Sequence, residues 1–244
     1  VVFVPGAADP GSSTIEASPT SITADGVSTS TVTVRLVDAN GNALVASGGE
    51  VVVSSSRGEV LGTVDEGDGS YTAVLRSSTA AGVAAVGFTL GGEVAGPTVP
   101  VTFVAGEASA GLSEISASPA SITADGASTS TITVRLVDAN GNPLTTSAGT
   151  VAIATDAGTL GATTDVGDGT YTAELTSSTT AGTATLSFTL DDVAAEATTT
   201  VDLTAGAVPL TTSTIEASPT SITADGTSTS TVTVSVVDWS PTVW

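Results

Sequence analysis

The feature of this sequence that most constrains its fold is an internal repeat with a period of one hundred residues. The run Ser13–Val37 returns almost unchanged as Ser213–Val237, and a more diverged copy begins at Ser113. The two outer copies differ only at Val27/Thr227, Arg35/Ser235 and Leu36/Val236. Solenoid units have periods of about 20–50 residues, so a repeat this long indicates duplication of a whole small domain.

The repeat predicts two complete domains, with fragments of the same domain at both ends. Each complete unit has the usual size of a domain and can bury its own core. We expect the last strand of a preceding unit at residues 1–6, complete units at 12–106 and 112–206, and an incomplete third unit with an aberrant tail at 212–244. We therefore expect the chain to be a processed product or part of a longer protein, also because it lacks an initiator Met.

Alternation of apolar and polar residues with period two predicts half-buried strands. In Thr31–Leu36, the side chains of Val32, Val34 and Leu36 share one face. Further inward sets are Tyr71, Ala73 and Leu75, and Ala84, Val86, Phe88 and Leu90, each with counterparts one hundred residues later. With turn dipeptides such as Asp25-Gly26 between these runs, the pattern predicts an all-β fold of tandem β-sandwiches of about seven strands each. Short links between the units predict an extended, semi-rigid array.

Composition excludes several classes of function. The net charge is −21, with four Arg and no Lys or His, so nucleic acid and anionic lipid are poor partners. Without Cys, His and Met the chain lacks the ligands for zinc, copper or haem and has no Ser-His-Asp arrangement. We therefore expect no enzyme and no cofactor. No apolar run has the length of a transmembrane helix, so we expect no membrane insertion by this segment.

Several motifs together resemble the bacterial immunoglobulin-like repeats of invasin- and intimin-type adhesins. They are Ser-Pro followed by ADG, a Thr/Val strand that ends in DANGN, and then GDGxYTA, in both complete units. The resemblance implies immunoglobulin-like sandwiches that form a stalk at the bacterial cell surface or in an extracellular fibre. It implies that any host receptor is bound by parts outside this chain, and it carries over no receptor-contacting residue.

Two functional interpretations follow. The first is a structural stalk or shaft that spaces or projects other parts of an adhesin. The alternative is a self-assembling filament subunit, whose partial terminal domains are completed by strands from neighbouring molecules. The expected partners are accordingly other copies of the chain or the remainder of a longer one. A glycan- or ice-binding module lacks the aromatic platforms or flat Thr arrays that it would need.

Tyr71 and Tyr171 are predicted to be structural. Each follows a Gly-Asp-Gly turn, at the position where immunoglobulin domains place a tyrosine corner near the start of a late strand. The hydroxyl is expected to hydrogen-bond back to the backbone, and we favour this role over ligand binding.

Calcium is the one metal that the sequence leaves open. Asp65, Asp68 and their counterparts Asp165 and Asp168 lie in acidic loops that supply carboxylate oxygens, although solvated acidic turns are the favoured interpretation. The run Asp38–Asn42 alternates like the start of a calcium loop. It has a Gly inside the triplet and no Glu at the bidentate position, so we favour a hairpin turn.

The chain ends suggest an assembly surface. An incomplete sandwich leaves an apolar face without its partner strands, and such a face requires a cover. The residues predicted to form this surface are Val2, Phe3, Val4, Ile215, Val232, Val234, Val236, Trp239 and Trp244. For the Trp-bearing tail, a poorly determined or foreign end on a truncated chain is the favoured interpretation, and the assembly role is the alternative.

Overall fold

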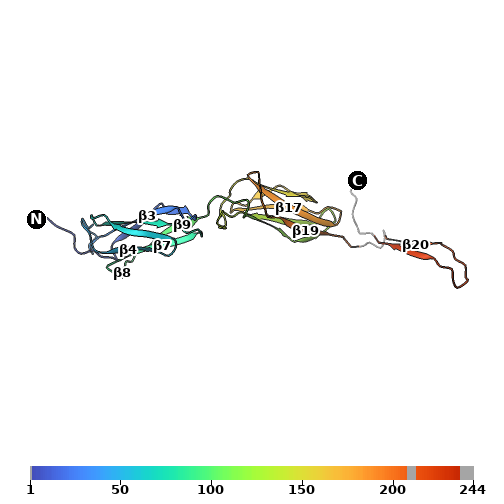
Figure 1. Cartoon of the computed structure of the whole chain (residues 1–244), viewed down its shortest axis with the longest axis horizontal. Coiled ribbons are helices and arrows are strands. Elements are labelled where there is room, and N and C mark those ends of the chain that lie inside the picture. The colour runs from blue at the N-terminus through green and yellow to red at the C-terminus, as the bar shows by residue number, and fades with distance from the viewer. Residues whose placement is uncertain (1, 208–212, 237–244) are drawn as a thin grey trace. The chain divides into compact units, whose positions relative to one another are not determined.

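The computed structural model describes residues 2–207 and 213–236, and all regular elements in these ranges are strands (Figure 1). The chain forms two compact units. The first comprises the residues up to Ser109 together with Val137–Thr145, and the second comprises Ala110–Leu136 and the residues from Thr146 onward. The loop Val137–Thr145, which the repeat assigns to the second copy, thus belongs to the first compact unit. No helix in the described ranges has the length and hydrophobicity of a membrane span.

The first unit contains a β-sandwich of two sheets. Its strands are β1 (Thr14–Ser18), β2 (Ser21–Thr23), β3 (Thr29–Arg35), β4 (Val51–Ser55), β5 (Glu59–Asp65), β6 (Ser70–Arg76), β7 (Gly82–Leu90), β8 (Glu93–Val94) and β9 (Val99–Val104). One sheet has the order β1-β3-β6-β5, and the other has the order β2-β9-β7-β4 with β8 on β7. This order matches the two sheets of constant-type immunoglobulin domains, which confirms the predicted fold class.

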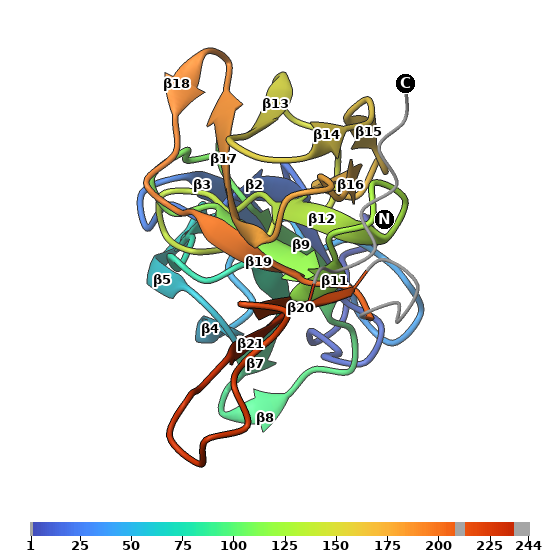
Figure 2. The ribbon, with the colours of Figure 1, turned by 90° about the vertical axis from the view of Figure 1, so that its right-hand side faces the viewer.

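The second unit repeats this topology. Its strands are β10 (Glu114–Ser118), β11 (Ser121–Thr123), β12 (Thr129–Arg135), β13 (Val151–Thr155), β14 (Thr159–Leu160), β15 (Thr164–Asp165), β16 (Thr170–Thr176), β17 (Gly182–Leu190), β18 (Val193–Ala194) and β19 (Thr199–Thr204). The sheets are β10-β12-β16-β14, with β15 on β16, and β11-β19-β17-β13, with β18 on β17. Figure 2 shows β17 turning back into the short strand β18. A hairpin of β20 (Thr214–Ser218) and β21 (Thr231–Ser235) follows.

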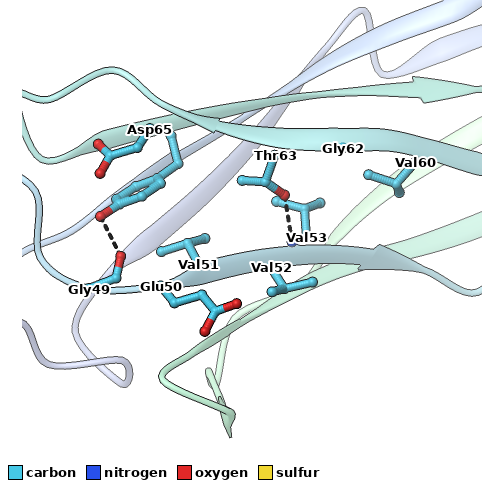
Figure 3. Close-up of a pocket in the computed structure, with 10 residues that line it drawn as sticks. Gly49, Glu50, Val51, Val52, Val53, Val60, Gly62, Thr63 and Asp65 are labelled. Atoms are coloured by element: carbon cyan, nitrogen blue, oxygen red, sulfur yellow. Dashed lines mark hydrogen bonds between the residues drawn. The ribbon is translucent and has the colours of Figure 1, made fainter.

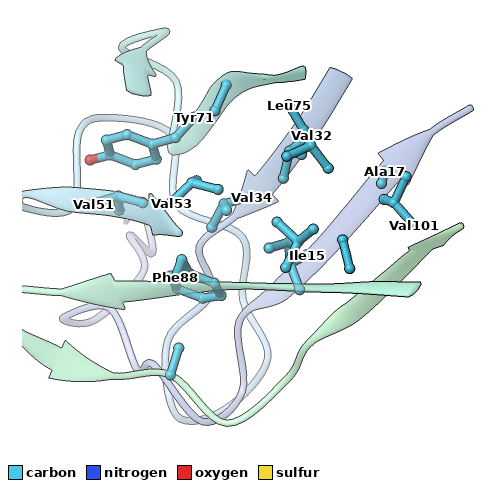
Figure 4. Packing of buried hydrophobic residues seen from close by; sticks show 14 of the residues in the cluster. Ile15, Ala17, Val32, Val34, Val51, Val53, Tyr71, Leu75, Phe88 and Val101 are labelled. Atoms are coloured by element: carbon cyan, nitrogen blue, oxygen red, sulfur yellow. The ribbon is translucent and has the colours of Figure 1, made fainter. Parts of the chain in front are cut away.

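The predicted alternation builds the core of each sandwich. Along β3, Ser30, Val32 and Val34 are buried while the residues between them are more exposed. Leu75 and Phe88 face the same interior from the two sheets, and both are almost inaccessible to solvent (Figure 4). The one polar member of this row, Ser30, donates its hydroxyl to the carbonyl of Pro19 at 2.7 Å, so its burial leaves no polar group unsatisfied.

Candidate functional site

Tyr71 begins β6, and its buried hydroxyl connects that strand to the loop before β4. The hydroxyl donates to the carbonyl of Gly49 at 2.7 Å, the bond drawn as a dashed line at Gly49 in Figure 3. It also accepts the N–H of Gly48 at 3.0 Å. In the second unit Tyr171 donates to the carbonyl of Ala148 at 3.0 Å and accepts the N–H of the same residue at 3.1 Å. Because β6 and β4 belong to different sheets, this contact connects a strand of one sheet to a loop that leads into the other.

The geometry differs from the tyrosine corner that the sequence pattern suggested. A tyrosine corner lies at the start of the sixth strand of an immunoglobulin domain and bonds to the backbone a few residues upstream. Tyr71 instead lies on β6, which stands between β3 and β5 in the place of the fifth strand, and it bonds 22 residues upstream. The sequence could not reveal this, because strand order within a sheet depends on long-range pairing. A structural role for Tyr71 and Tyr171 remains a prediction.

A groove of about 480 Å³ lies between the edge strands β4 and β5. Thr63 spans it, since its hydroxyl accepts the N–H of Val53 at 3.1 Å (Figure 3). Its walls are mostly small or apolar: Gly49, Glu50, Val51, Val52, Val53, Val60, Gly62, Thr63, Asp65 and Tyr71. The polar side chains of this lining are two carboxylates and two hydroxyls. The lining contains no His or Cys, so it offers no nucleophile paired with a base of the usual kind.

The acidic loop candidates for calcium use their carboxylates within their own turns. Asp65 accepts the N–H of Gly67 and Asp68 accepts the N–H of Ser70, both at 2.9 Å. The corresponding carboxylates of Asp165 and Asp168 accept backbone N–H groups in the second unit at 2.9 and 3.0 Å. Within residues 2–207 and 213–236, no three acidic, His or Cys side chains converge as a metal site would require. Calcium binding therefore remains a prediction from sequence alone.

Hydrogen bonds hold the carboxylates of Asp65 and Asp68 in the ionised form. The pKa of Asp65 is lowered, first by the Ser47 hydroxyl and then by the N–H of Gly67. The pKa of Asp68 is lowered by the side chain and the N–H of Ser70. Hydrogen bonds to a carboxylate favour its charged form. The lowered pKa of Asp68 therefore follows from its own turn, whereas that of Asp65 also depends on Ser47 outside the turn.

The run Asp38–Asn42 is a turn organised around a buried carboxylate. Asp38 accepts N–H groups from Gly6 at 2.8 Å and from Asn40 and Asn42 at 2.9 Å, and it also accepts the side-chain amide of Asn42. The amide of Asn42 is the largest cause of the lowered pKa of Asp38. Gly41 adopts a φ of +81°, the left-handed conformation that glycine tolerates best. Both oxygens of Asp38 thus serve the turn itself, which supports the hairpin-turn interpretation.

The predicted assembly residues are exposed wherever the structure describes them. Phe3 is 92% exposed, and Ile215 and Val234 are 72% and 60% exposed. The remaining exposed members of the set are Val2, Val4, Val232 and Val236. Trp239 and Trp244 lie outside the described residues. The assembly surface remains a prediction.

Comparison with known proteins finds adhesin domains. The family model for Invasin, domain 3, matches residues 9–106 and again residues 109–206. The structure of Yersinia pseudotuberculosis InvD is 28% identical over 94% of this chain and 71% of that chain, with a TM-score of 0.63. The Escherichia coli adhesin FdeC is 26% identical over 97% of this chain and 76% of that chain, with a TM-score of 0.70.

Invasin, a bacterial integrin-binding protein, is a third similar structure. It is 25% identical with a TM-score of 0.61, and the match covers 98% of this chain but only 56% of the invasin chain. The present chain therefore corresponds to little more than half of the solved part of invasin. The similarity concerns the repeated sandwich and assigns no ligand-binding residue.

Proposed function

The chain belongs to the family of invasin domain 3, and from this premise we propose that its sandwiches form part of the stalk of a bacterial cell-surface adhesin. The supporting observation is that one complete immunoglobulin-like sandwich occurs twice in tandem, each with its own core. In such arrays stability is approximately a sum over units, so repeats can be added without destabilising the others. The number of repeats can therefore set the length of the stalk. We place any contact with a host receptor in other parts of the parent adhesin.

The pairing of the last strand of each sandwich with the second strand suits a load-bearing element. In the first unit β2 and β9 are parallel, and Thr102 donates its N–H to the carbonyl of Thr20 at 2.8 Å. In the second unit β11 and β19 are parallel in the same way, and the N–H of Asp202 lies 2.9 Å from the carbonyl of Ala120. Tension on the two ends of a sandwich pulls such strands in opposite directions, so their hydrogen bonds are loaded together in shear.

Small-angle scattering of the purified chain tests the stalk. We expect an elongated particle whose maximum dimension shrinks when residues 107–206 are deleted in register. A compact particle with the dimensions of a single globule would contradict the proposal.

Single-molecule stretching tests the load-bearing element. We expect two unfolding events for the two sandwiches, and Thr102→Pro should lower the force of one event because proline removes the N–H that reaches Thr20. Thr102→Ala keeps that N–H and is the matched control. An unchanged force in the proline variant would show that β2 and β9 carry no load.

A filament subunit is the second candidate, and the exposure of the β20–β21 hairpin favours it. The apolar side chains of this hairpin are exposed, although their counterparts in the complete repeats are buried. Strands donated by a neighbouring molecule would cover them by β-augmentation. Electron microscopy should then show filaments, and Val234→Glu should abolish them. A stable monomer in sedimentation would exclude this candidate.

A further inference from the structure

The loop Asp138–Asn142 binds backbone groups of the first repeat through its asparagines, all within the first compact unit. The side-chain amide of Asn142 donates to the carbonyl of Thr79 at 2.9 Å, and its side-chain oxygen accepts the N–H of Ala81 at 2.8 Å. Asn140 donates to the carbonyl of Ala24 at 3.2 Å. Asn142 is only 7% exposed, so these hydrogen bonds are largely shielded from water.

The first repeat contains the same loop in the same conformation. Asp38 accepts the N–H of Gly6 at 2.8 Å, and Asp138 accepts the N–H of Gly106 at 2.9 Å. The glycine inside each loop has nearly the same φ, +81° and +79°. The loop Asp38–Asn42 therefore adopts its shape without the contacts that Asn140 and Asn142 make. This preorganisation reduces the entropy that a partner would have to overcome on binding.

The two loops differ in the surroundings of their asparagines. Asn40 and Asn42 are exposed. Among the residues that the structure describes, the side-chain amide of Asn42 bonds to the carboxylate of its own loop alone, at 3.0 and 3.1 Å. Asn142 makes the corresponding bond to Asp138 at 2.8 Å and contacts Thr79 and Ala81 in addition. Asn142 bonds the carbonyl of Thr79 through its side-chain amide, which also bonds Asp138, and it bonds the N–H of Ala81 through its side-chain oxygen.

We propose that the loop Asp38–Asn42 is an interaction surface for the end of another repeat of this kind, with Asn40 and Asn42 as its contact residues. The partner groups are two carbonyls and one N–H, arranged as they are at Ala24, Thr79 and Ala81. All three belong to the backbone, so recognition depends on the fold of the partner repeat and tolerates changes in its side chains. The inference does not depend on the stalk function, because it concerns which surfaces fit together.

The third copy of the repeat departs from the pattern at these positions. Where the first two copies have Asn at 40 and 42 and at 140 and 142, the third has Ser240 and Thr242. Neither side chain carries the paired amide donor and carbonyl acceptor with which Asn142 binds Thr79 and Ala81. The sequence therefore limits this mode of recognition to the first two copies.

Hydrogen exchange in the full chain, followed by NMR, tests the occupied loop. Asn142→Ala should accelerate exchange of the Ala81 N–H by about two- to tenfold, the equivalent of one net hydrogen bond. The matched control Asn42→Ala removes the same bonds within its loop and should leave Ala81 unchanged. Unchanged protection of Ala81 in Asn142→Ala would overturn the assignment of the contact.

A chain extended by one repeat tests the surface itself. Residues 1–106 are placed before residues 7–244, so that the loop Asp38–Asn42 of the full chain follows a complete repeat. In this extended chain, Asn42→Ala in the second of the two copies should accelerate exchange of the Ala81 N–H of the added repeat. The proposal is wrong if the Ala81 N–H of the added repeat stays equally protected in this variant, while Asn142→Ala still accelerates exchange of the Ala81 N–H in the following repeat.

Discussion

Two hairpins of nearly identical sequence have opposite surroundings in this protein. The strands β1 and β3 pair Ile15 with Val34, and β20 and β21 pair Ile215 with Val234 in the same register. Ile15 is 8% exposed whereas Ile215 is 72% exposed. Pairing and register therefore follow from the local sequence, whereas burial follows from the second sheet of a complete sandwich.

The turn within each hairpin separates local from tertiary contributions in the same way. Asp25 and Asp225 both accept N–H groups two and three residues later, at 2.6–2.9 Å. Only Asp25 is also hydrogen-bonded by Ser77, at 3.1 Å, because that serine lies directly after β6. The complete repeat thus adds a long-range contact to a turn that already forms by itself.

The largest expected difference comes from truncating the buried isoleucine. Ile15→Ala should lower the free energy of unfolding of the first repeat by about 2–5 kcal/mol, because it leaves a cavity in the core. Ile215→Ala should change the free energy of unfolding of either repeat by less than about 0.5 kcal/mol, since its side chain is exposed. Chemical denaturation followed by circular dichroism measures both variants. Equal effects would mean that the β20–β21 hairpin is buried in solution.

A smaller loss is expected from the tyrosine that joins the two sheets. Tyr71→Phe removes the hydroxyl that bonds Gly48 and Gly49. It should cost about 1–3 kcal/mol, because two part-buried hydrogen bonds are lost and each contributes about 0.5–1.5 kcal/mol. Tyr171→Phe should cost a similar amount in the second repeat. Thermal unfolding measures both variants, and a neutral result for both would contradict the structural role predicted for these residues.

Ser77 tests the long-range hydrogen bonds that distinguish the turn at Asp25 from the turn at Asp225. Ser77→Ala removes hydrogen bonds to Asp25 and from the N–H of Gly26, and it should cost about 0.5–1.5 kcal/mol. Ser177→Ala is the matched variant in the second repeat, where the same two bonds occur. The carbon chemical shifts of Asp225 should stay unchanged in both variants. A shift there would argue against a purely local turn in the third copy.

The smallest difference is expected in the titration of the two turns. The pKa of Asp25 and of Asp225 lies below the ordinary value of 3.8, chiefly because the N–H of Ser28 or Ser228 bonds the carboxylate. Carbon NMR titration should therefore find both groups ionised at pH 3.8. A normal pKa for Asp225 alone would show that its turn needs the rest of the sandwich.

The lowered pKa of Asp25 makes the stability of the first repeat depend on pH in one direction. A carboxyl whose pKa is lower in the folded state stabilises the fold fully above its unfolded pKa, and this contribution is lost as pH falls through the folded pKa. The stability that Asp25 provides to the first repeat should hold at neutral pH and decline below pH 3.8. Asp25→Asn should flatten this acid limb. A limb of unchanged steepness would assign the acid sensitivity to other groups.

Much of the fold was predictable because its signals are local. The alternation at Val32 and Val34 identified a buried face, and Asp25-Gly26 identified a turn whose hydrogen bonds span only three residues. The partner of Tyr71 was not predictable in the same way. Its hydroxyl reaches Gly49, and only the order of the strands brings these residues together. The contacts of Asn142 escaped detection for the same reason, since Asn42 has the same neighbours in sequence.

By itself the sequence determined the repeat, the strand pattern and the aspartate turns, because these depend on side chains and backbone groups a few residues apart. The tertiary structure decided which copies of the same residues are buried or engaged. Ile15 differs from Ile215, and Asn142 from Asn42, because burial and long-range hydrogen bonds require a second surface that a local sequence does not contain.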